Sequence, residues 1–156
     1  MNDPSSAMDG SFEIDRQRIM QMIPHRDPFL MIDKLTDLVT NEQATGIKFV
    51  SPDEYYFKGH FPSRPVMPGV VIVEAMAQTA AVLVVHTLGT AAEGKLVYFM
   101  SIEKAKFRRP VVPGETLRVH VTKQQHHRNV WKFKGEAKVE GKLVAEAVFA
   151  AMIMGN

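Results

Sequence analysis

The segment Gly69–Leu88 constrains the fold more than any other part of the sequence, because it is the only long helix that the residue pattern indicates. Pro65, Pro68 and the first glycine of the segment mark its start, and Gly89 marks its end. Apolar residues occur on nearly all of its faces, so the helix must be surrounded by other structure. The remaining elements are therefore expected to wrap around it.

The same segment is long enough to cross a membrane, but three polar side chains interrupt it. Glu74, Gln78 and His86 lie within it, and a carboxylate in the middle of a bilayer costs about 2.5–3.5 kcal/mol. Glu74 and Gln78 lie four residues apart and share one stripe of the helix. We therefore predict a buried helix and no association with a membrane.

Strand patterns dominate the rest of the chain. In Val130–Val139, apolar residues alternate with lysine and glutamate, which is the period of a half-buried strand. Ile14–Ile23 predicts a short amphipathic helix that ends at Pro24. This order of elements predicts an α+β fold class, with a mostly antiparallel sheet curled round one long central helix. The predicted strands are Leu30–Val39, Gln43–Val50, Tyr98–Phe107, Leu117–Gln125, Val130–Val139 and Leu143–Met154.

Length and composition fit a single domain. The chain has 156 residues, and domains commonly contain about 100–200. Residues 1–11 are polar and lack the apolar stretch of an export signal, so we predict a disordered tail at 1–11 and one domain at 12–156. The absence of cysteine excludes disulfides, thiolate metal sites and a cysteine nucleophile. A net charge of +2 is too small to predict nucleic acid as the main partner.

One loop-to-helix unit carries residues suited to catalysis. His60 lies in a proline-rich loop, Gly69 opens the long helix, and Glu74 follows just over one turn later. Histidine is a ready general base near neutral pH, and the first N–H groups of a helix suit a developing oxyanion. Burial should raise the pKa of Glu74, which would allow its carboxyl group to hold a proton. Each residue also has a structural interpretation, as a loop hydrogen bond, a helix cap or an ion-paired core residue.

The histidines predict no metal site. His126 and His127 are adjacent and would point to opposite sides of a strand, while His25, His86 and His120 are scattered along the sequence.

Four segments resemble the FabZ-type 3-hydroxyacyl-acyl-carrier-protein dehydratases of bacterial fatty-acid synthesis. The most specific is GHFPSRPVMPGVVIVEAMAQ at residues 59–78. IPHRDPFLMID (Ile23–Asp33), YFMSIEKAKFRRPVVPGE (Tyr98–Glu115) and KLVAEA (Lys142–Ala147) resemble further motifs of the family. The resemblance covers roughly residues 14–154 and implies the hot-dog fold, in which a sheet wraps round a central helix.

The resemblance also implies roles for individual residues. His60 matches the catalytic histidine of the family, Glu74 its catalytic glutamate, and Gly69 the glycine whose N–H binds the thioester oxygen. Related dehydratase/isomerases have aspartate at the position of Glu74, so isomerase activity is not expected. Further substrate contacts are implied at Phe61, Pro68, Val70, Gln78 and Tyr98, the last as a gate of the acyl tunnel.

The implied reaction is the dehydration of (3R)-3-hydroxyacyl-acyl carrier protein to the trans-2-enoyl product, in the cytoplasm and without a cofactor. In the family, His60 and Glu74 would come from different subunits of a homodimer, and dimers often assemble into trimers of dimers. Two alternatives remain: a hot-dog acyl thioesterase, and a non-catalytic acyl-carrier-binding protein. The histidine of the GHFP motif argues against the first, and the presence of both His60 and Glu74 argues against the second.

A basic stretch is a candidate surface for the acidic acyl carrier protein. Lys104, Lys106, Arg108 and Arg109 lie close together in the sequence. In a regular strand, Lys104, Lys106 and Arg108 would share a face. A solvated strand face is the alternative interpretation.

Overall fold

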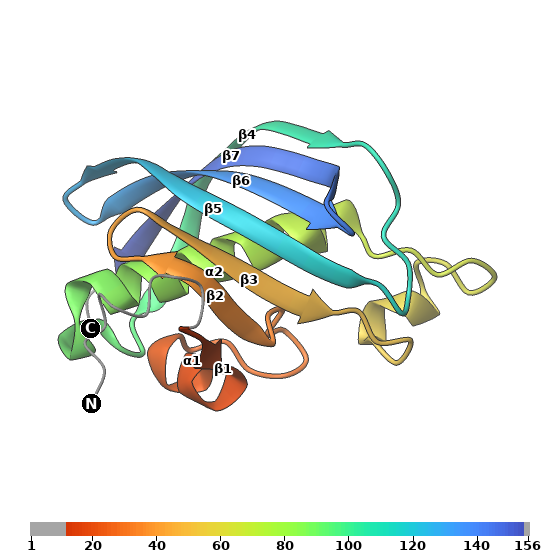
Figure 1. Ribbon diagram of the computed structural model, residues 1–156, viewed down its shortest axis with the longest axis horizontal. Helices are drawn as coiled ribbons and strands as arrows, with labels where there is room; N and C mark the ends of the chain where they lie inside the picture. Colours follow the sequence, from red (N-terminus) through yellow and green to blue (C-terminus); the bar gives the residue numbers. More distant parts are fainter. Residues whose placement is uncertain (1–11, 155–156) are drawn as a thin grey trace.

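The computed structural model describes residues 12–154, so the tail predicted at residues 1–11 lies outside the described residues. Figure 1 shows the elements in chain order. Their bounds are β1 (Ile14–Asp15), α1 (Arg16–Met22), β2 (Lys34–Val39), β3 (Gln43–Phe49), η2 (Tyr55–Lys58), α2 (Gly69–Leu88), η3 (Thr90–Ala92), β4 (Leu96–Phe107), β5 (Thr116–His127), β6 (Val130–Val139) and β7 (Lys142–Met154).

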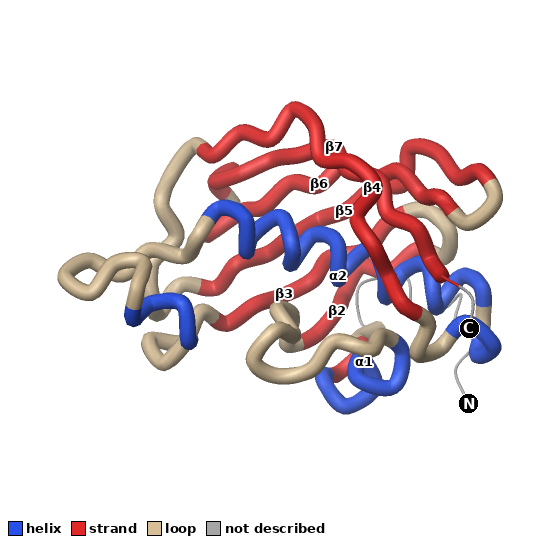
Figure 2. The backbone as a smooth tube through the Cα atoms, turned by 180° about the vertical axis from the view of Figure 1, so that it is seen from behind, coloured by secondary structure: helices blue, strands red, loops and turns tan. Residues whose placement is uncertain are grey.

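Within residues 12–154, the strands form one seven-stranded sheet in the order β1-β2-β3-β5-β6-β7-β4. Each neighbouring pair is antiparallel. The sheet curves over α2, which lies across one of its faces in both views (Figures 1 and 2). The predicted α+β layout, with an antiparallel sheet round one long central helix, is confirmed.

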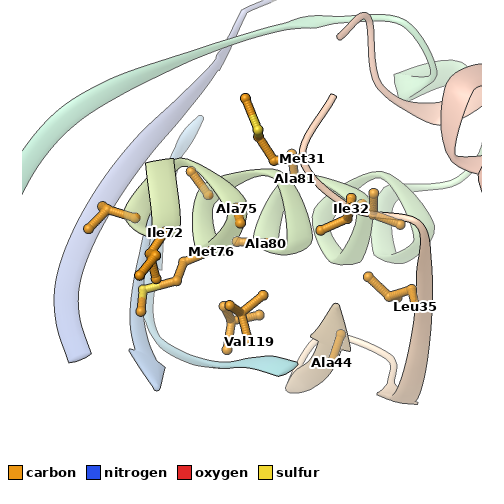
Figure 3. Packing of buried hydrophobic residues seen from close by; sticks show 14 of the residues in the cluster. Met31, Ile32, Leu35, Ala44, Ile72, Ala75, Met76, Ala80, Ala81 and Val119 are labelled. Carbon is orange, nitrogen blue, oxygen red and sulfur yellow. The ribbon is translucent and has the colours of Figure 1, made fainter. Parts of the chain in front are cut away.

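α2 is apolar on nearly all of its faces because most of its length, Ile72–Val85, is packed inside the protein. Figure 3 shows Met31 and Val119 on opposite sides of the helix, one from the loop before β2 and the other from β5. The helix is long and apolar enough to span a membrane, but 72% of its most apolar stretch is buried within the protein. Burial in a protein core therefore accounts for its composition.

β3 approaches α2 closely at Gly46. A Cβ atom at Gly46 would lie 2.0 Å from Oγ1 of Thr79, a buried helix residue. That hydroxyl donates a hydrogen bond to the carbonyl oxygen of Ala75 at 2.8 Å, which keeps it against the helix. The absence of a side chain at Gly46 is therefore what allows the sheet to lie this close to α2.

Several predicted boundaries differ from the structure: β4 begins at Leu96 and β5 ends at His127, each two residues beyond the prediction, and two further boundaries have a clear physical reason. Ile14–Asp15 is a short strand, and the helix begins only at Arg16, because the carboxylate of Asp15 accepts a hydrogen bond from the Arg18 N–H and caps the helix. The predicted strand at Leu30–Val39 begins only at Lys34. Before it, Leu30, Met31 and Ile32 form a buried loop whose Met31 N–H donates to the Gln78 side chain at 2.7 Å instead of to a neighbouring strand.

β4 forms one edge of the sheet and pairs only with β7 within residues 12–154. Nearly all of its residues are exposed, on both faces of the strand. The pairing register shifts between Phe99 and Ser101 and again between Glu103 and Lys106. These irregularities interrupt the simple alternation of side chains that a regular strand would have.

Candidate active site

Hydrogen bonds with Val66 fix His60 in the loop that joins β3 to α2. The Val66 N–H donates to the His60 carbonyl oxygen at 2.9 Å, and Nδ1 of His60 lies 2.8 Å from the Val66 carbonyl oxygen. A carbonyl oxygen can only accept, so Nδ1 carries the proton of the neutral ring and Nε2 carries the lone pair. The Met67 N–H donates to the Val111 carbonyl oxygen at 2.8 Å, which attaches the end of this loop to the connection between β4 and β5. The ring of His60 is therefore oriented as a base at Nε2.

His60 and the N-terminus of α2 line one cavity of about 480 Å³. The N–H groups of Val71 and Ile72 donate to the Pro68 carbonyl oxygen at 3.0 and 3.2 Å. The N–H groups of Gly69 and Val70 precede them, where a helix offers no acceptor of its own. Together with the helix dipole, they suit an oxygen that develops negative charge. The cavity is lined by His60, Val66, Met67, Gly69, Val70, Ile72, Phe107, Arg108, Arg109, Pro110 and Val111.

Gly69 is required by the close approach of Phe107. A Cβ atom at Gly69 would lie 2.7–3.0 Å from three ring atoms of Phe107. Phe107 ends β4 and lines the same cavity as His60. The glycine therefore lets an aromatic ring close one side of the cavity next to the helix N-terminus.

Glu74 lies in a second, much smaller cavity of about 20 Å³, lined by His25, Glu74, Ala77, Val97, Phe99 and Ala151. Burial raises the pKa of Glu74, and a hydrogen bond from the Gln78 amide at 2.8 Å partly opposes this shift. Nε2 of His25 lies 3.7 Å from a Glu74 carboxylate oxygen. The carboxyl group is thus suited to hold a proton at a higher pH than an exposed glutamate.

The structure does not bring His60 and Glu74 together within one chain. The cavity of His60 and the cavity of Glu74 share no lining residue. The two side chains therefore line separate cavities of one chain.

The other predicted substrate contacts fall in different places. The Phe61 ring stacks on the His60 ring at a centroid distance of 4.2 Å, and Val70 is 77% exposed at the mouth of the His60 cavity. Pro68 is the N-cap residue of α2. Tyr98 is exposed on β4, and its neighbours in the strand, Val97 and Phe99, line the Glu74 cavity instead.

Gln78 is buried, and its amide is engaged on both sides. Its Nε2 donates to Glu74 and to the Phe29 carbonyl oxygen, each at 2.8 Å, while its oxygen accepts from the Met31 N–H. These bonds orient the Glu74 carboxyl group and attach α2 to the loop before β2.

The basic residues divide into two groups. Arg108 donates to Glu146 at 2.8 Å, and Lys104 and Lys106 line a cavity of about 330 Å³ beside the same carboxylate. Arg109 instead donates to both carboxylate oxygens of Glu115, at 2.8 and 3.3 Å. Lys104, Lys106 and Arg108, which were predicted to share a face, all lie near Glu146. The strand between them is not regular, because the register shifts between Glu103 and Lys106 and the φ of Lys104 is 54°.

Two residues that the sequence did not single out line the cavities. His25 contacts Glu74 and was interpreted as one of several scattered histidines, although it lies in the IPHRDPFLMID segment. Phe107 closes the His60 cavity and was predicted only as a strand residue. Among residues 12–154, no three histidine, aspartate or glutamate side chains gather to hold a metal ion.

Comparisons with known proteins identify similar chains over most of this length. A family model described as "FabA-like domain" matches residues 23–148. A curated protein from Rhodospirillum rubrum, named 3-hydroxyacyl-[acyl-carrier-protein] dehydratase FabZ, is 67% identical over 141 residues, which are 90% of this chain and 88% of that protein. A protein of the same name from Granulibacter bethesdensis is 60% identical over 153 residues, covering 98% of this chain and 89% of that protein.

Solved structures with low sequence identity share the fold. The dehydratase heterocomplex ApeI:P from Xenorhabdus doucetiae matches with a TM-score of 0.75 and 15% identity, over 88% of this chain and 91% of that chain. A hypothetical thioesterase with coenzyme A from Streptococcus pneumoniae matches with a TM-score of 0.55 and 12% identity, over 76% of this chain and 83% of that chain. At these identities the likeness concerns the fold alone, and the predicted hot-dog fold is confirmed.

Proposed function

The chain belongs to the FabZ family of 3-hydroxyacyl-[acyl-carrier-protein] dehydratases, and from this premise we propose how its residues catalyse the reaction. The enzyme is a hydro-lyase of fatty-acid biosynthesis. It removes water from a (3R)-3-hydroxyacyl thioester on acyl carrier protein and leaves the trans-2-enoyl thioester. Membership of a biosynthetic family supports action in the cytoplasm.

In the proposed mechanism, Nε2 of His60 takes a proton from C2 of the acyl chain. The electron pair of that C–H bond forms the C2–C3 double bond, and the bond between C3 and the hydroxyl oxygen breaks. The carboxyl group of Glu74 gives its proton to the departing oxygen, which leaves as water. The N–H of Gly69 donates to the thioester oxygen as negative charge develops on it. A later proton transfer from His60 to Glu74 restores both groups.

One observation carries this assignment of the base. The hydrogen bond from Nδ1 of His60 to the Val66 carbonyl oxygen leaves Nε2 as the basic nitrogen, in the same cavity as the helix N-terminus. A general base and an oxyanion donor on one cavity are what removal of a proton next to a thioester requires.

In the test, the protein is incubated with 3-hydroxybutyryl thioester. The absorbance of the enoyl product is followed over time, and the products are identified by mass spectrometry. Enoyl thioester should accumulate with wild-type protein and be absent with His60→Ala. Free 3-hydroxybutyrate as the main product would identify a thioesterase and overturn the proposal.

We further propose that the working unit is a homodimer formed across β4, with dimers assembling into trimers. Three large apolar side chains on this edge strand, Tyr98, Met100 and Ile102, are 52%, 53% and 49% exposed. An edge strand with unpaired backbone groups and exposed apolar side chains is a ready surface for a second copy. Light scattering after size exclusion should give the mass of six chains for the wild-type protein. Met100→Glu places a charge in the proposed β4 interface and should lower that mass below two chains per particle. A monomeric wild-type protein, or a Met100→Glu variant with the wild-type mass, would contradict the proposal.

For the carrier protein, we propose docking at Lys104, Lys106, Arg108 and Arg109. The two arginines line the His60 cavity, and the two lysines precede them on β4 and line the separate cavity beside Glu146. Arg109 forms an ion pair with Glu115 in the connection between β4 and β5, so its substitution would also disturb the local structure. Substitution of the two lysines is therefore the more specific test of docking.

Lys104→Glu combined with Lys106→Glu should raise the KM for a carrier-protein substrate, most strongly at low salt, where screening is weak. Activity on a short thioester without carrier protein should be nearly unchanged. Lys95→Glu combined with Arg128→Glu makes the same change in net charge before the start of β4 and in the β5–β6 turn, and serves as the matched control. Equal effects of the two pairs would show that docking does not use this surface.

A further inference from the structure

His25 is a largely buried titratable side chain that the mechanism does not use. Its side chain is only 15% exposed, and that of Glu74 is 17% exposed. Nε2 of His25 lies 3.7 Å from the nearer Glu74 oxygen, and Nδ1 is buried without a hydrogen-bond partner within residues 12–154. A buried polar atom without a partner is costly and calls for an explanation.

The surroundings of the pair contain little other charge. The cavity wall is completed by Ala77, Val97, Phe99 and Ala151, contributed by α2, β4 and β7. The remaining polar neighbour is the Gln78 amide, which is neutral and donates to Glu74.

Arg26 is the nearby cation, but its guanidinium donates to the carbonyl oxygens of Ile23 and His25 and not to Glu74. Among residues 12–154, no lysine or arginine forms an ion pair with Glu74. When Glu74 loses its proton, the donors available to stabilise the new carboxylate are therefore Gln78 and His25.

The protonation states of the two groups are complementary. Burial, and to a lesser extent Arg26, lowers the pKa of His25. Burial also raises the pKa of Glu74. The lowered pKa favours the neutral N–H form of the imidazole, and the raised pKa extends the pH range over which the carboxyl group holds its proton.

We propose that His25 is a positioning residue for Glu74, whose Nε2–H donates a hydrogen bond to the Glu74 carboxylate after that group has given its proton to the departing oxygen. This inference rests on the proposed dehydratase function. A distance of 3.7 Å is too long for a hydrogen bond to the protonated acid, and it shortens when the carboxylate carries a full charge. His25 keeps its own proton throughout, so the step moves one proton only, from Glu74 to the product water.

The test compares two substitutions at His25. His25→Gln keeps an N–H donor near the position of Nε2 and cannot titrate, whereas His25→Leu removes the donor at similar size. His86→Leu is the matched control, because His86 is also a partly buried histidine with a lowered pKa but contacts Thr40 at the other end of α2. Two quantities are measured against pH: kcat on 3-hydroxybutyryl thioester, and the ¹³C shift of the Glu74 carboxyl carbon, assigned by its loss in Glu74→Gln.

His25→Leu should lower kcat by about 10- to 100-fold, the range expected for a lost hydrogen bond to a charged group, and leave KM nearly unchanged. It should also raise the pKa of Glu74, because the ionised form has lost a donor. If protonated Glu74 is the acid, the high-pH limb of the kcat profile moves to higher pH by the same amount. His25→Gln should restore most of kcat and the original titration, and His86→Leu should behave as wild type.

An unchanged Glu74 titration in His25→Leu would overturn the proposal, whatever happens to kcat, because a merely structural role could lower activity without moving that titration. Equal losses in His25→Gln and His25→Leu would overturn it as well. Failure of the dehydratase mechanism has a different signature, namely full activity in Glu74→Gln.

Discussion

Gly69→Ala tests whether the contact between the helix N-terminus and Phe107 shapes the catalytic cavity. The added Cβ atom would lie 2.7, 2.8 and 3.0 Å from Cε1, Cδ1 and Cζ of the Phe107 ring. Carbon atoms in contact prefer about 3.5–4.0 Å, so either the ring or the first turn of α2 must move by about 1 Å. Both border the cavity that contains His60.

The effect on stability should be small. Overpacking in a tight core costs about 1–3 kcal/mol, but Phe107 is half exposed and can shift toward solvent. Alanine is also favoured over glycine in a helix by up to about 1 kcal/mol. The two effects largely cancel, and we expect Tm to change by about 2–4 °C at most, the shift that 1 kcal/mol produces in a domain of this size.

The effect on activity should be much larger. Loss of one oxyanion donor costs about 10²–10³ in kcat in enzymes that use such a site, and a displaced donor should cost somewhat less, about 10- to 100-fold. The assay is kcat/KM from enoyl absorbance, with Tm from circular dichroism on the same samples. Phe107→Ala removes the atoms that the new methyl group would meet, so the double variant should recover to the level of Phe107→Ala alone. Wild-type kinetics in Gly69→Ala, or a double variant as impaired as Gly69→Ala, would refute this reasoning.

Two further predictions concern the catalytic pair. His60→Ala should abolish dehydration and leave the circular dichroism spectrum unchanged, because His60 lies in a loop outside the core; turnover near wild type would remove His60 from the mechanism. Glu74→Gln should lower turnover strongly with little change in KM, since it removes a proton used only in the transition state. The same variant should also show a pH-dependent gain in Tm. Because burial raises the pKa of Glu74, the folded protein binds more protons than the unfolded chain between the two pKa values, and wild-type stability falls as pH rises through that interval. The gain should therefore be absent at about pH 4 and present above the raised pKa; a constant difference in Tm would show that Glu74 titrates normally.

The periodicity of the sequence was sufficient for most of the fold. Leu117, Val119 and Val121 alternate in β5 and are fully buried, as a period of two predicts. The apolar segment Leu30–Ile32 was wrongly predicted as part of a strand, because a buried loop and a buried strand have similar composition. What separates them is the partner of the Met31 N–H, the side chain of Gln78, which lies 47 residues away.

In the site, too, the local sequence pattern does not predict contacts between residues that are far apart in the sequence. His60, Gly69 and Glu74 could be found together because one loop-to-helix unit carries all three within a short segment. The contact between His25 and Glu74 joins residues 49 positions apart, and neither residue type nor local pattern indicates such a pair. The bulge in β4 is equally hidden, because the residues around Lys104 have the composition of a regular strand.

The geometry of α2 accounts for the separation of the two cavities. The first N–H groups point along the helix axis, out of its N-terminus, where Gly69 and Val70 line the His60 cavity. Glu74 follows more than one turn later, and its side chain projects from the side of the helix into the cavity beside β4. Two of the residues around Glu74, Val97 and Phe99, belong to the exposed edge strand. A second copy bound at β4, as proposed above, would therefore lie next to the Glu74 cavity.

This arrangement predicts complementation between two inactive variants. In a two-fold dimer of His60→Ala and Glu74→Gln subunits, one site combines both substitutions, and the other combines the intact His60 of one subunit with the intact Glu74 of its partner. After unfolding and refolding of an equal mixture, activity should reach about a quarter of wild type, since about half of the dimers are mixed and each has one intact site of two. If His60 and Glu74 acted within one chain, no mixed dimer would contain an intact site. The refolded mixture would then be as inactive as its parents, although light scattering still showed the assembly of the wild-type protein.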